Sequence, residues 1–351
     1  DSPAIIYYTS GTTGGHKGVL HTHHTLLVAV EIYAKFILDK VHPAVDVAPE
    51  DALTKHQIVN TPLFHLMGFL MLNMCLLKGM PAVINLSPDP AKMLRMIKEY
   101  EPIFLLTYPL MVKNLLKNAD ADIRSLKVIV SSGSRLRREI ADSFLRRFKS
   151  VKFLAQGFGM TEVGPSHLPL LNERCSVESV GAVVEEYEQK VLEIDRARAC
   201  LPGELGELCI RGPSMMVGYL NMEKETNVAI YEEGWLHTGD AGYLNELGEF
   251  HLIDRVKDTI IIECRGTIHR VSRNIIENIN RMNEQENALL ANKCLRAFIL
   301  KGAKQIDEAT ILDLVSENLP ECMHLTGGIR FVEEIPRTRV GKLLRRKLPI
   351  D

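Results

Sequence analysis

Apolar residues in the middle of the chain occur in short runs separated by longer amphipathic stretches. Between residues 81 and 153 the runs have β-type composition, whereas the intervening stretches have helical spacing. Short runs that alternate with helices are typical of strands buried on both faces of a parallel sheet. We therefore predict an α/β fold with a mostly parallel sheet and flanking helices. The expected strands are 82–86, 103–107, 126–130 and 151–155, and the expected helices are 91–100 and 136–148.

The N-terminal pattern differs, because small and hydroxylated residues separate a β-type run at 4–8 from a helix expected between His24 and about Leu38. We interpret it as a strand, a loop and a helix. Glycines in such a loop let backbone N–H groups approach a phosphate, hydroxyls donate further hydrogen bonds, and Lys17 supplies positive charge. The spacing is not that of a Walker loop, because Gly18 follows Lys17 where serine or threonine is required. The candidate phosphate-binding residues are Thr9, Ser10, Gly11, Thr12, Thr13, Gly14 and Lys17.

Two further polar segments each follow an expected strand. They are Ser131–Ser134 and Gln156–Glu162. Ligands of open parallel sheets bind beyond the carboxyl ends of the strands, so both segments are candidates for one site. His21, His23 and His24 also stand close together, but the further ligands of a metal site are absent nearby, and we expect no metal there.

Past Ser179 the pattern changes to short β-runs separated by glycine and proline. This pattern of short strands and turns predicts a compact β subdomain at about 177–220. A tight Thr-Gly turn then ends at Asp240, whose carboxylate could accept hydrogen bonds from a ribose diol or could form an ordinary Asx turn.

Composition narrows the class of protein without identifying it. The 351 residues carry 46% hydrophobic and 25% charged side chains with a net charge of −2, which gives no case for nucleic acid as a partner. No apolar run is long enough for a transmembrane segment. The seven cysteines include no C-x-x-C pair, which favours a reducing compartment. Because the chain starts at Asp1 inside a strand pattern, we interpret it as an N-terminally truncated fragment, with the cytoplasm as the default location.

These motifs, in this order, resemble the adenylate-forming (AMP-binding) superfamily, in the branch of acyl-CoA synthetases, coumarate-CoA ligases and firefly luciferase. The resemblance covers the phosphate loop, Pro62-Leu-Phe-His65, Gln156-Gly-Phe-Gly-Met-Thr-Glu162, Thr238-Gly-Asp240, Asp254-Arg-Val-Lys257 and Pro336-Arg-Thr-Arg-Val-Gly-Lys342. It implies a large domain at 1–253, a hinge at 254–258 and a small α+β C-terminal domain at 259–351.

The resemblance also implies roles for individual residues. His65 edges the carboxylate pocket, Thr161 lies near the phosphates, Glu162 binds Mg²⁺, and Lys342 swings in as the catalytic lysine. The ribose is contacted by Asp240 and Arg255. Further implied ATP-binding residues are Ser132, Gly133, Ser134, Gln156, Gly157, Phe158 (against the adenine), Gly159, Met160 and Lys257, and the implied CoA-binding residues are Arg265 and Gly266.

The function implied is that of an ATP-dependent carboxylic acid–CoA ligase. ATP, Mg²⁺, CoA and a small carboxylic acid, aromatic or of medium aliphatic length, would be its ligands. Adenylation followed by transfer to oxygen or to a carrier-protein thiol stays open, as does a catalytically impaired nucleotide-binding remnant. The missing N-terminal subdomain and the altered, shortened C-terminal domain favour the remnant. His16 also replaces the proline that is usual in the phosphate loop. Some relatives carry a Ser-Lys-Leu peroxisomal signal, but this chain ends in Leu-Pro-Ile-Asp.

Overall fold

The protein was analysed as a computed structural model. It describes residues 2–10, 16–85, 87, 89–194, 198–256, 259–264, 267–272, 297–300, 307–318, 324–325 and 328–332. The chain divides into two compact units, the first made of Asp1–Thr238 and Tyr243–Leu252, the second of Gly239–Gly242 and Ile253–Asp351.

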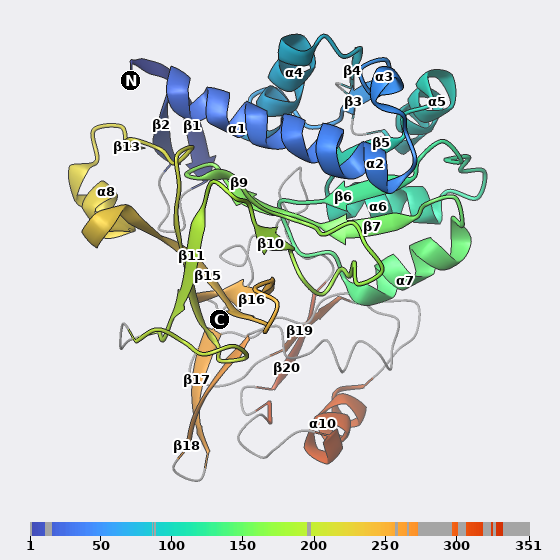
Figure 1. Cartoon of the computed structure of the whole chain (residues 1–351). Coiled ribbons are helices and arrows are strands. Elements are labelled where there is room, and N and C mark those ends of the chain that lie inside the picture. Colours follow the sequence, from blue (N-terminus) through green and yellow to red (C-terminus); the bar gives the residue numbers. More distant parts are fainter. Residues whose placement is uncertain are drawn as a thin grey trace. The chain divides into compact units, whose positions relative to one another are not determined.

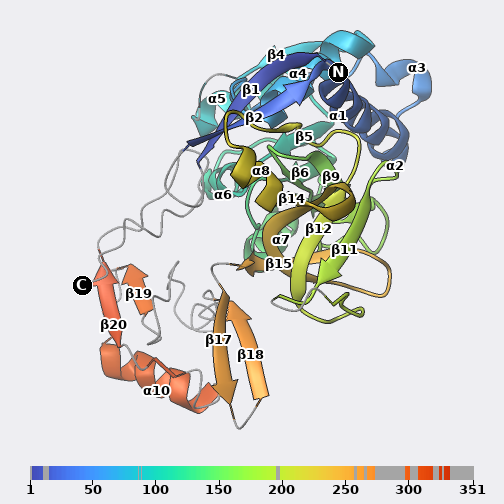
Figure 2. The ribbon, with the colours of Figure 1, turned by 90° about the vertical axis from the view of Figure 1, so that its left-hand side faces the viewer.

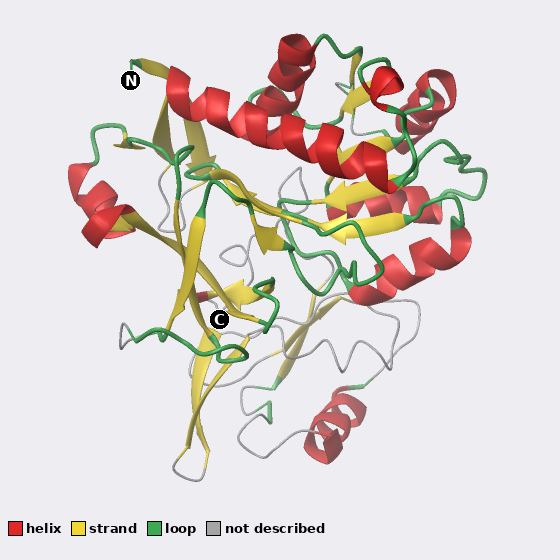
Figure 3. Ribbon diagram, in the orientation of Figure 1, coloured by secondary structure: helices red, strands yellow, loops and turns green. Residues whose placement is uncertain are grey.

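The centre of the first unit is a parallel sheet with helices on both faces, which confirms the predicted fold class (Figures 1 and 3). Its strands pair in the order β5-β6-β7, and β3 and β4 form a second parallel pair. These strands are β3 (Gln57–Val59), β4 (Ala82–Ile84), β5 (Phe104–Thr107), β6 (Val128–Ser131) and β7 (Phe153–Gln156). The helices are α1 (His23–Lys35), α4 (Leu66–Lys78), α5 (Pro90–Tyr100), α6 (Pro109–Lys117) and α7 (Arg138–Arg147).

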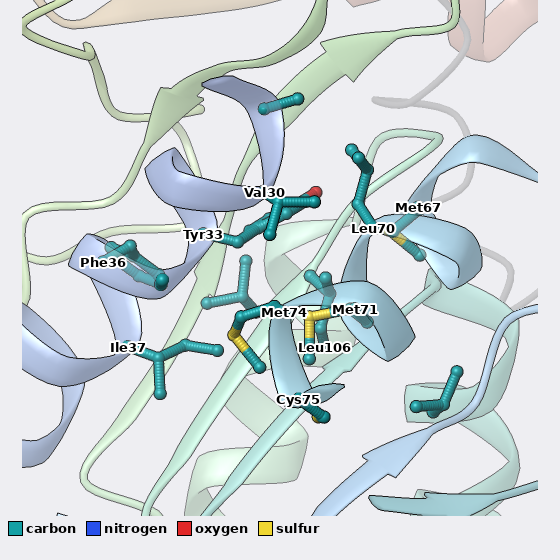
Figure 4. Close-up of a cluster of buried hydrophobic side chains, with 14 of the residues drawn as sticks. Val30, Tyr33, Phe36, Ile37, Met67, Leu70, Met71, Met74, Cys75 and Leu106 are labelled. Carbon is teal, nitrogen blue, oxygen red and sulfur yellow. The ribbon is translucent and has the colours of Figure 1, made fainter. Parts of the chain in front are cut away.

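Alternate residues of the strands enter two different cores. Phe104 and Leu106 pack with α1 and α4 on one face, whereas Leu105 packs with α5, α6 and α7 on the other. Figure 4 shows the first of these cores, where Tyr33 and Ile37 approach Met71 and Met74. Burial on both faces explains why the strand sequences are continuously apolar rather than alternating.

The N-terminal segment corrects one prediction. Lys17 and Gly18 do not lie in a loop leading to a helix, because β1 (Pro3–Ser10) and β2 (His16–Thr22) form an antiparallel hairpin in which Thr9 pairs with Lys17. A third strand, β13 (Gly218–Tyr219), pairs with β2. Helix α1 then begins at His23, where Thr22 forms a capping box with Thr25.

Two connections also differ from expectation. The segment after α1 does not become irregular at residue 39, because it continues as a π-helix at Phe36–Val41, then α2 (His42–Ala44) and, after a turn, α3 (Pro49–Ala52). Helix α6 has no counterpart among the predicted elements. It begins with Pro109 at its first turn, a position where the missing N–H carries no penalty.

The remaining strands of the first unit, two of which (β15 and β16) continue into the second unit, are antiparallel. Strands β8 (Phe158–Met160), β9 (Gly164–Leu168) and β10 (Ala182–Val183) form one sheet in the order β10-β9-β8. A five-stranded sheet has the order β11-β12-β15-β14, with β16 beside β15. It consists of β11 (Glu188–Leu192), β12 (Gly206–Arg211), β14 (Ile230–Tyr231), β15 (Trp235–Leu244) and β16 (Phe250–Arg255). The short helix α8 (Glu223–Ala229) and a 3₁₀ turn at Glu232–Gly234 complete this region.

The described part of the second unit is a small α+β assembly (Figure 2). It contains the antiparallel hairpin β17–β18 (Thr259–Cys264 and Thr267–Ser272), the parallel pair β19–β20 (Ala297–Leu300 and Ile329–Val332) and helix α10 (Glu308–Asn318). No helix in the described ranges is long and apolar enough to cross a lipid bilayer.

Candidate active site

The carboxyl ends of β6 and β7 bring the two predicted glycine-containing segments together. Ser131 pairs with Gln156, and the carbonyl of Ser131 accepts a hydrogen bond from Gly157 N at 3.0 Å. Ser131 Oγ is fully buried and makes no hydrogen bond to any residue that the structure describes. Both segments therefore lie at one sheet edge, as the parallel topology predicts.

Gln156 was expected to contact ATP, but in the structure its side chain is hydrogen-bonded to the backbone. Its side-chain oxygen accepts from Leu136 N, and its amide nitrogen donates to Val177 O. The side chain is buried and both ends are occupied by backbone groups. Gln156 therefore connects the start of α7 and the segment before β10 to the sheet edge.

After Gly157 the chain turns into the β8–β9 hairpin, where Phe158 pairs with His167. A Cβ atom on Gly159 would lie 2.4 Å from the carbonyl oxygen of Gly164, so this close approach requires glycine. The Phe158 ring contacts His167 edge-on, with centroids 5.6 Å apart. Burial lowers the pKa of His167 to about 4, which leaves its imidazole neutral and hydrogen-bonded to Ser166 and Gln189.

A small hollow with an accessible volume of about 10 Å³ lies beside Phe158. Its lining residues are Tyr33, Leu106, Val130, Ser132, Gly157, Phe158, Pro165, His167 and Leu168. Ser132, Gly157 and Phe158 were expected at a site from the sequence, whereas the other six were not. They come from α1, β5, β6 and β9, so no local motif could have identified them. His65 does not line this hollow.

Lys17, Tyr219 and Glu162 form a polar contact between the N-terminal hairpin and the segment after β8. The Lys17 ammonium lies 4.4 Å from the centre of the Tyr219 ring. The Tyr219 hydroxyl donates to Glu162 Oε1 at 3.1 Å. Glu162 is 9% exposed, and its backbone oxygen accepts from Met216 N at 2.8 Å. Two predicted site residues are thus joined by a tyrosine that the sequence analysis did not single out.

His21 connects the same two segments through the backbone. Its Nε2 lies 2.7 Å from the carbonyl oxygen of Thr161, to which it donates, and its Nδ1 lies 3.1 Å from Thr25 Oγ1. Burial lowers the pKa of His21, while the Thr161 carbonyl and the Glu162 carboxylate act in the opposite direction. His21 therefore holds Thr161 in place, whereas His23 and His24 are exposed.

His65 lies at the N-terminus of α4, where its Nδ1 accepts from Met67 N at 3.3 Å. The close turn before this helix depends on Gly68, since a Cβ there would lie 2.4 Å from the carbonyl oxygen of Thr61. The neighbouring Phe64 is 77% exposed. In the described structure this motif is a helix cap with an exposed aromatic ring beside it.

In the second unit, the two expected ribose residues contact one another. Arg255 Nε lies 3.0 Å from Asp240 Oδ1, and the Asp240 side chain is only 6% exposed. Gly239 has φ of 70°, a conformation that glycine adopts without strain in the turn before Asp240. The pair shows that the Thr-Gly-Asp and Asp-Arg motifs meet in the fold.

Several predicted site residues lie outside the described residues, and the structure does not test them. They are Gly11, Thr12, Thr13, Gly14, Lys257, Arg265, Gly266 and Lys342. Ser10 is described as part of β1 by its backbone alone, and Thr9 pairs with Lys17. Ser132, Gly133 and Ser134 follow β6, and Met160 ends β8.

The AMP-binding enzyme family matches residues 1–220, which include the hairpin, the β6–β7 edge and Tyr219. The chain belongs to this family. Over 98% of its length it is 29% identical to a probable 4-coumarate–CoA ligase of Dictyostelium discoideum, but it spans only 62% of that relative.

The fold of the AMP-binding enzymes is also present in solved structures. ATP-bound MatB from Rhodopseudomonas palustris superposes with a TM-score of 0.84 at 21% identity, over 97% of this chain and 66% of MatB. A Bacillus subtilis o-succinylbenzoate–CoA synthetase in complex with ATP and magnesium gives 0.81 at 24% identity, over 99% and 70%. These likenesses establish the fold of the chain as that of an adenylate-forming enzyme.

The site chemistry fits MgATP. Glu162 offers a carboxylate oxygen, the ligand type that Mg²⁺ prefers, and Lys17 offers a cation for phosphate. Among the described residues there is no cluster of three or more His, Cys, Asp or Glu side chains suited to a metal. A metal that arrived with the triphosphate would need only one or two protein carboxylates, because phosphate oxygens and water complete its coordination.

Proposed function

We propose that this AMP-binding enzyme activates a carboxylic acid with ATP, forming acyl-AMP and pyrophosphate, and transfers the acyl group to CoA. The observation that carries the proposal is that Tyr219 contacts both the Lys17 ammonium and the Glu162 carboxylate, while His21 holds the backbone of the neighbouring Thr161. A cation and a carboxylate that face one side chain suit a magnesium-bound triphosphate.

In the first step the acid's carboxylate oxygen attacks the α-phosphorus, and pyrophosphate leaves. Magnesium, when bound with ATP, neutralises charge on the phosphate oxygens. Lys17 binds the phosphates, Thr161 donates its hydroxyl and Glu162 holds the metal from the protein side. Lys342 is proposed to neutralise charge developing between the carboxylate and the α-phosphate. In the second step the CoA thiol attacks the acyl carbonyl, its proton leaves, and AMP is released.

The nucleotide's other contacts are proposed on the sequence motifs and on where the structure places them. Phe158 offers an aromatic face to the adenine, and Asp240 with Arg255 offers a carboxylate and a guanidinium to the ribose. The division of the chain at Ile253 supports a hinge at 254–258 between a large domain and a small one. CoA contacts are assigned to Arg265 and Gly266.

The acid is proposed to be apolar, aromatic or of medium aliphatic length. The support is the apolar segment at 66–70, where Leu66, Met67 and Leu70 are buried, because apolar side chains suit an uncharged body rather than an amino acid. The relatives named 4-coumarate–CoA ligase are consistent with an aromatic acid.

The proposal is tested by acid-dependent exchange of labelled pyrophosphate into ATP, run over a panel of aromatic, aliphatic and amino acids. Exchange with apolar acids, together with CoA-dependent thioester formation, is the expected result. Exchange without a CoA requirement would instead favour transfer to oxygen or to a carrier protein. ATP binding without pyrophosphate exchange for any acid would contradict the proposed enzymatic activity and favour a nucleotide-binding remnant. Lys342→Ala should slow the exchange by about 10²–10³-fold, as for the loss of one transition-state donor.

A further inference from the structure

One tyrosine contacts both charged groups that the proposed function assigns to MgATP. Tyr219 lies on β13 opposite Val19 of β2, and Lys17 is two residues before Val19 on the same face of the hairpin. Cross-strand neighbours on one face of an antiparallel pair lie within reach of a long side chain. The geometry of the short strand β13 therefore places the Tyr219 ring under the Lys17 ammonium.

The contacts with Lys17 and Glu162 use different parts of the Tyr219 side chain. The π face carries Lys17, at 4.4 Å from the ring centre. The hydroxyl donates to Glu162 Oε1 at 3.1 Å, a hydrogen bond strengthened by the charge of its acceptor. A phenylalanine would keep the first contact and lose the second, whereas a leucine would lose both.

A lysine and a glutamate that serve one ligand have opposite charges and attract each other. A direct ion pair between them would occupy the ammonium that phosphate needs and the carboxylate that the metal needs. Tyr219 gives each group a partner that binds it more weakly than the proposed ligand would. Lys17 contacts an aromatic π face instead of a phosphate, and Glu162 accepts from a neutral hydroxyl instead of binding a metal ion. Both groups are thereby oriented without being neutralised.

We propose that Tyr219 is a positioning residue that holds Lys17 and Glu162 apart and oriented for a magnesium-bound triphosphate. This inference rests on the proposed function for its ligand. Tyr219 takes no part in bond making or breaking. Its hydroxyl acts through Glu162 on metal-dependent binding, and its ring acts through Lys17 on binding of the phosphates themselves.

The first test is equilibrium binding of ATP by calorimetry, with no acid present, in EDTA and over a series of Mg²⁺ concentrations. Tyr219→Phe should leave binding in EDTA within about twofold of the parent but raise the Mg²⁺ concentration needed for half-maximal enhancement by about three- to tenfold. Tyr219→Leu should show the same Mg²⁺ shift and also weaken binding in EDTA by about three- to fivefold.

Tyr187→Phe is the matched control for loss of a tyrosine hydroxyl in this region. The Tyr187 hydroxyl donates to Val163 O, one residue after Glu162, and lies beside Ser214 Oγ, but Tyr187 contacts neither Lys17 nor the Glu162 carboxylate. It should lower thermal stability without shifting the Mg²⁺ dependence. Equal Mg²⁺ dependence in Tyr219→Phe and the parent, or the same shift in Tyr187→Phe, would overturn the proposal.

The second test needs no nucleotide. Brief acylation of surface amines, followed by peptide mass spectrometry, measures the reactivity of Lys17 relative to the exposed lysines of the same chain. Lys17 should react at the same rate in the parent and Tyr219→Phe, and about two- to fivefold faster in Tyr219→Leu, because only leucine removes the π contact. Equal rates in all three would show that the ring does not hold Lys17.

The two tests separate this inference from the proposed function. If the parent binds no ATP but Lys17 becomes more reactive in Tyr219→Leu, then MgATP as the ligand is wrong and the contact between Tyr219 and Lys17 stands. If the parent binds MgATP and the variants match it in both tests, then the function stands and the role of Tyr219 is wrong. Circular dichroism of each variant confirms that the fold is retained.

Discussion

Two polar regions of the first unit are stabilised by different kinds of interaction, neutral hydrogen bonds in one and charged contacts in the other. The first, called the β6–β8 edge below, consists of the carboxyl ends of β6 and β7 with the β8–β9 hairpin that follows. There Gln156 and His167 are buried and bonded to uncharged groups. On the β12–β15 part of the antiparallel sheet, His237 Nδ1 lies 2.9 Å from the Glu207 carboxylate and 3.6 Å from Cys209 Sγ, and its ring stacks on Tyr231. Burial lowers the pKa of His167 to about 4, whereas the Cys209 and Glu207 contacts raise the pKa of His237 to about 10.

The difference shows that the neighbours, rather than the residue type, decide whether a histidine in this fold is neutral or charged. Desolvation penalises the imidazolium where no anion is near, and an adjacent carboxylate stabilises it. The β6–β8 edge, which belongs to the candidate site, therefore depends on neutral hydrogen bonds, and the β12–β15 cluster depends on charge. The two regions should respond differently to substitution and to pH.

The largest effect is expected at Gln156. Gln156→Ala removes two buried hydrogen bonds and leaves Leu136 N and Val177 O without these partners, which should cost about 3–4 kcal/mol of unfolding free energy. Urea unfolding followed by circular dichroism measures it. Asn73→Ala is the control, because the Asn73 amide makes one hydrogen bond within its own helix, to Phe69 O, and should cost under about 1 kcal/mol. Similar losses for both variants would show that Gln156 does not organise this edge.

His167 should make the β6–β8 edge sensitive to acid. Its folded pKa is below the unfolded value, so the unfolded chain takes up a proton first as the pH falls. Stability from this group is fully present above pH 6.5 and is lost as the pH falls towards 4. Between pH 7 and pH 5 the loss should be about 2 kcal/mol. Unfolding curves of the parent and His167→Gln at pH 7 and pH 5 isolate the contribution of His167. The loss of unfolding free energy between the two pH values should be about 2 kcal/mol smaller in the variant than in the parent.

His237 should show the opposite pH dependence. Its folded pKa lies above the unfolded value, so its contribution to stability is fully present below pH 6.5 and is lost as the pH rises towards 10. Glu207→Gln should lower the pKa of His237 by about one unit or more, which NMR titration of the imidazole measures. Cys209→Ala separates the thiol from the carboxylate. A pKa that moves in neither variant would contradict the interpretation of the cluster as a charged one.

The smallest effect is expected at Ser131. Its hydroxyl is buried without a hydrogen bond to the described part of the chain, so Ser131→Ala should change stability by no more than about 0.5 kcal/mol, or raise it slightly. Thermal melts of the parent and the variant measure the difference. A loss above about 1 kcal/mol would show that Ser131 has a buried partner and that the β6–β8 edge contains another neutral hydrogen bond.

Local patterns predicted the βα units well and the phosphate segment poorly. Strands β5, β6 and β7 and helices α5 and α7 lie within one or two residues of expectation, because their apolar positions follow a single period in each element. Lys17 was expected in a loop before a helix and lies in a strand. The segment His16–Thr22 pairs with β1 through backbone hydrogen bonds, which its polar side chains do not reveal.

Site residues divide in the same way. Phe158, Thr161 and Glu162 were singled out because their motif is contiguous, and their binding roles stay predictions. Tyr219 and His21 were not predicted to contact this motif, because their partners, Glu162 and Thr161 respectively, are more than fifty positions away in the sequence. Gln156 was identified within the right motif, but its backbone partners, Leu136 and Val177, are visible only in the folded chain.

By itself the sequence determined the α/β class, the order of the motifs and the resemblance to adenylate-forming enzymes, because each depends on residue types at short spacing. Only the tertiary structure decided which of those residues meet. Lys17 and Glu162 come to share Tyr219 because β13 pairs with β2, and Asp240 comes to pair with Arg255 because β15 lies beside β16. The physical reason is that such contacts depend on strand register and on burial by distant segments, neither of which is encoded within a local window.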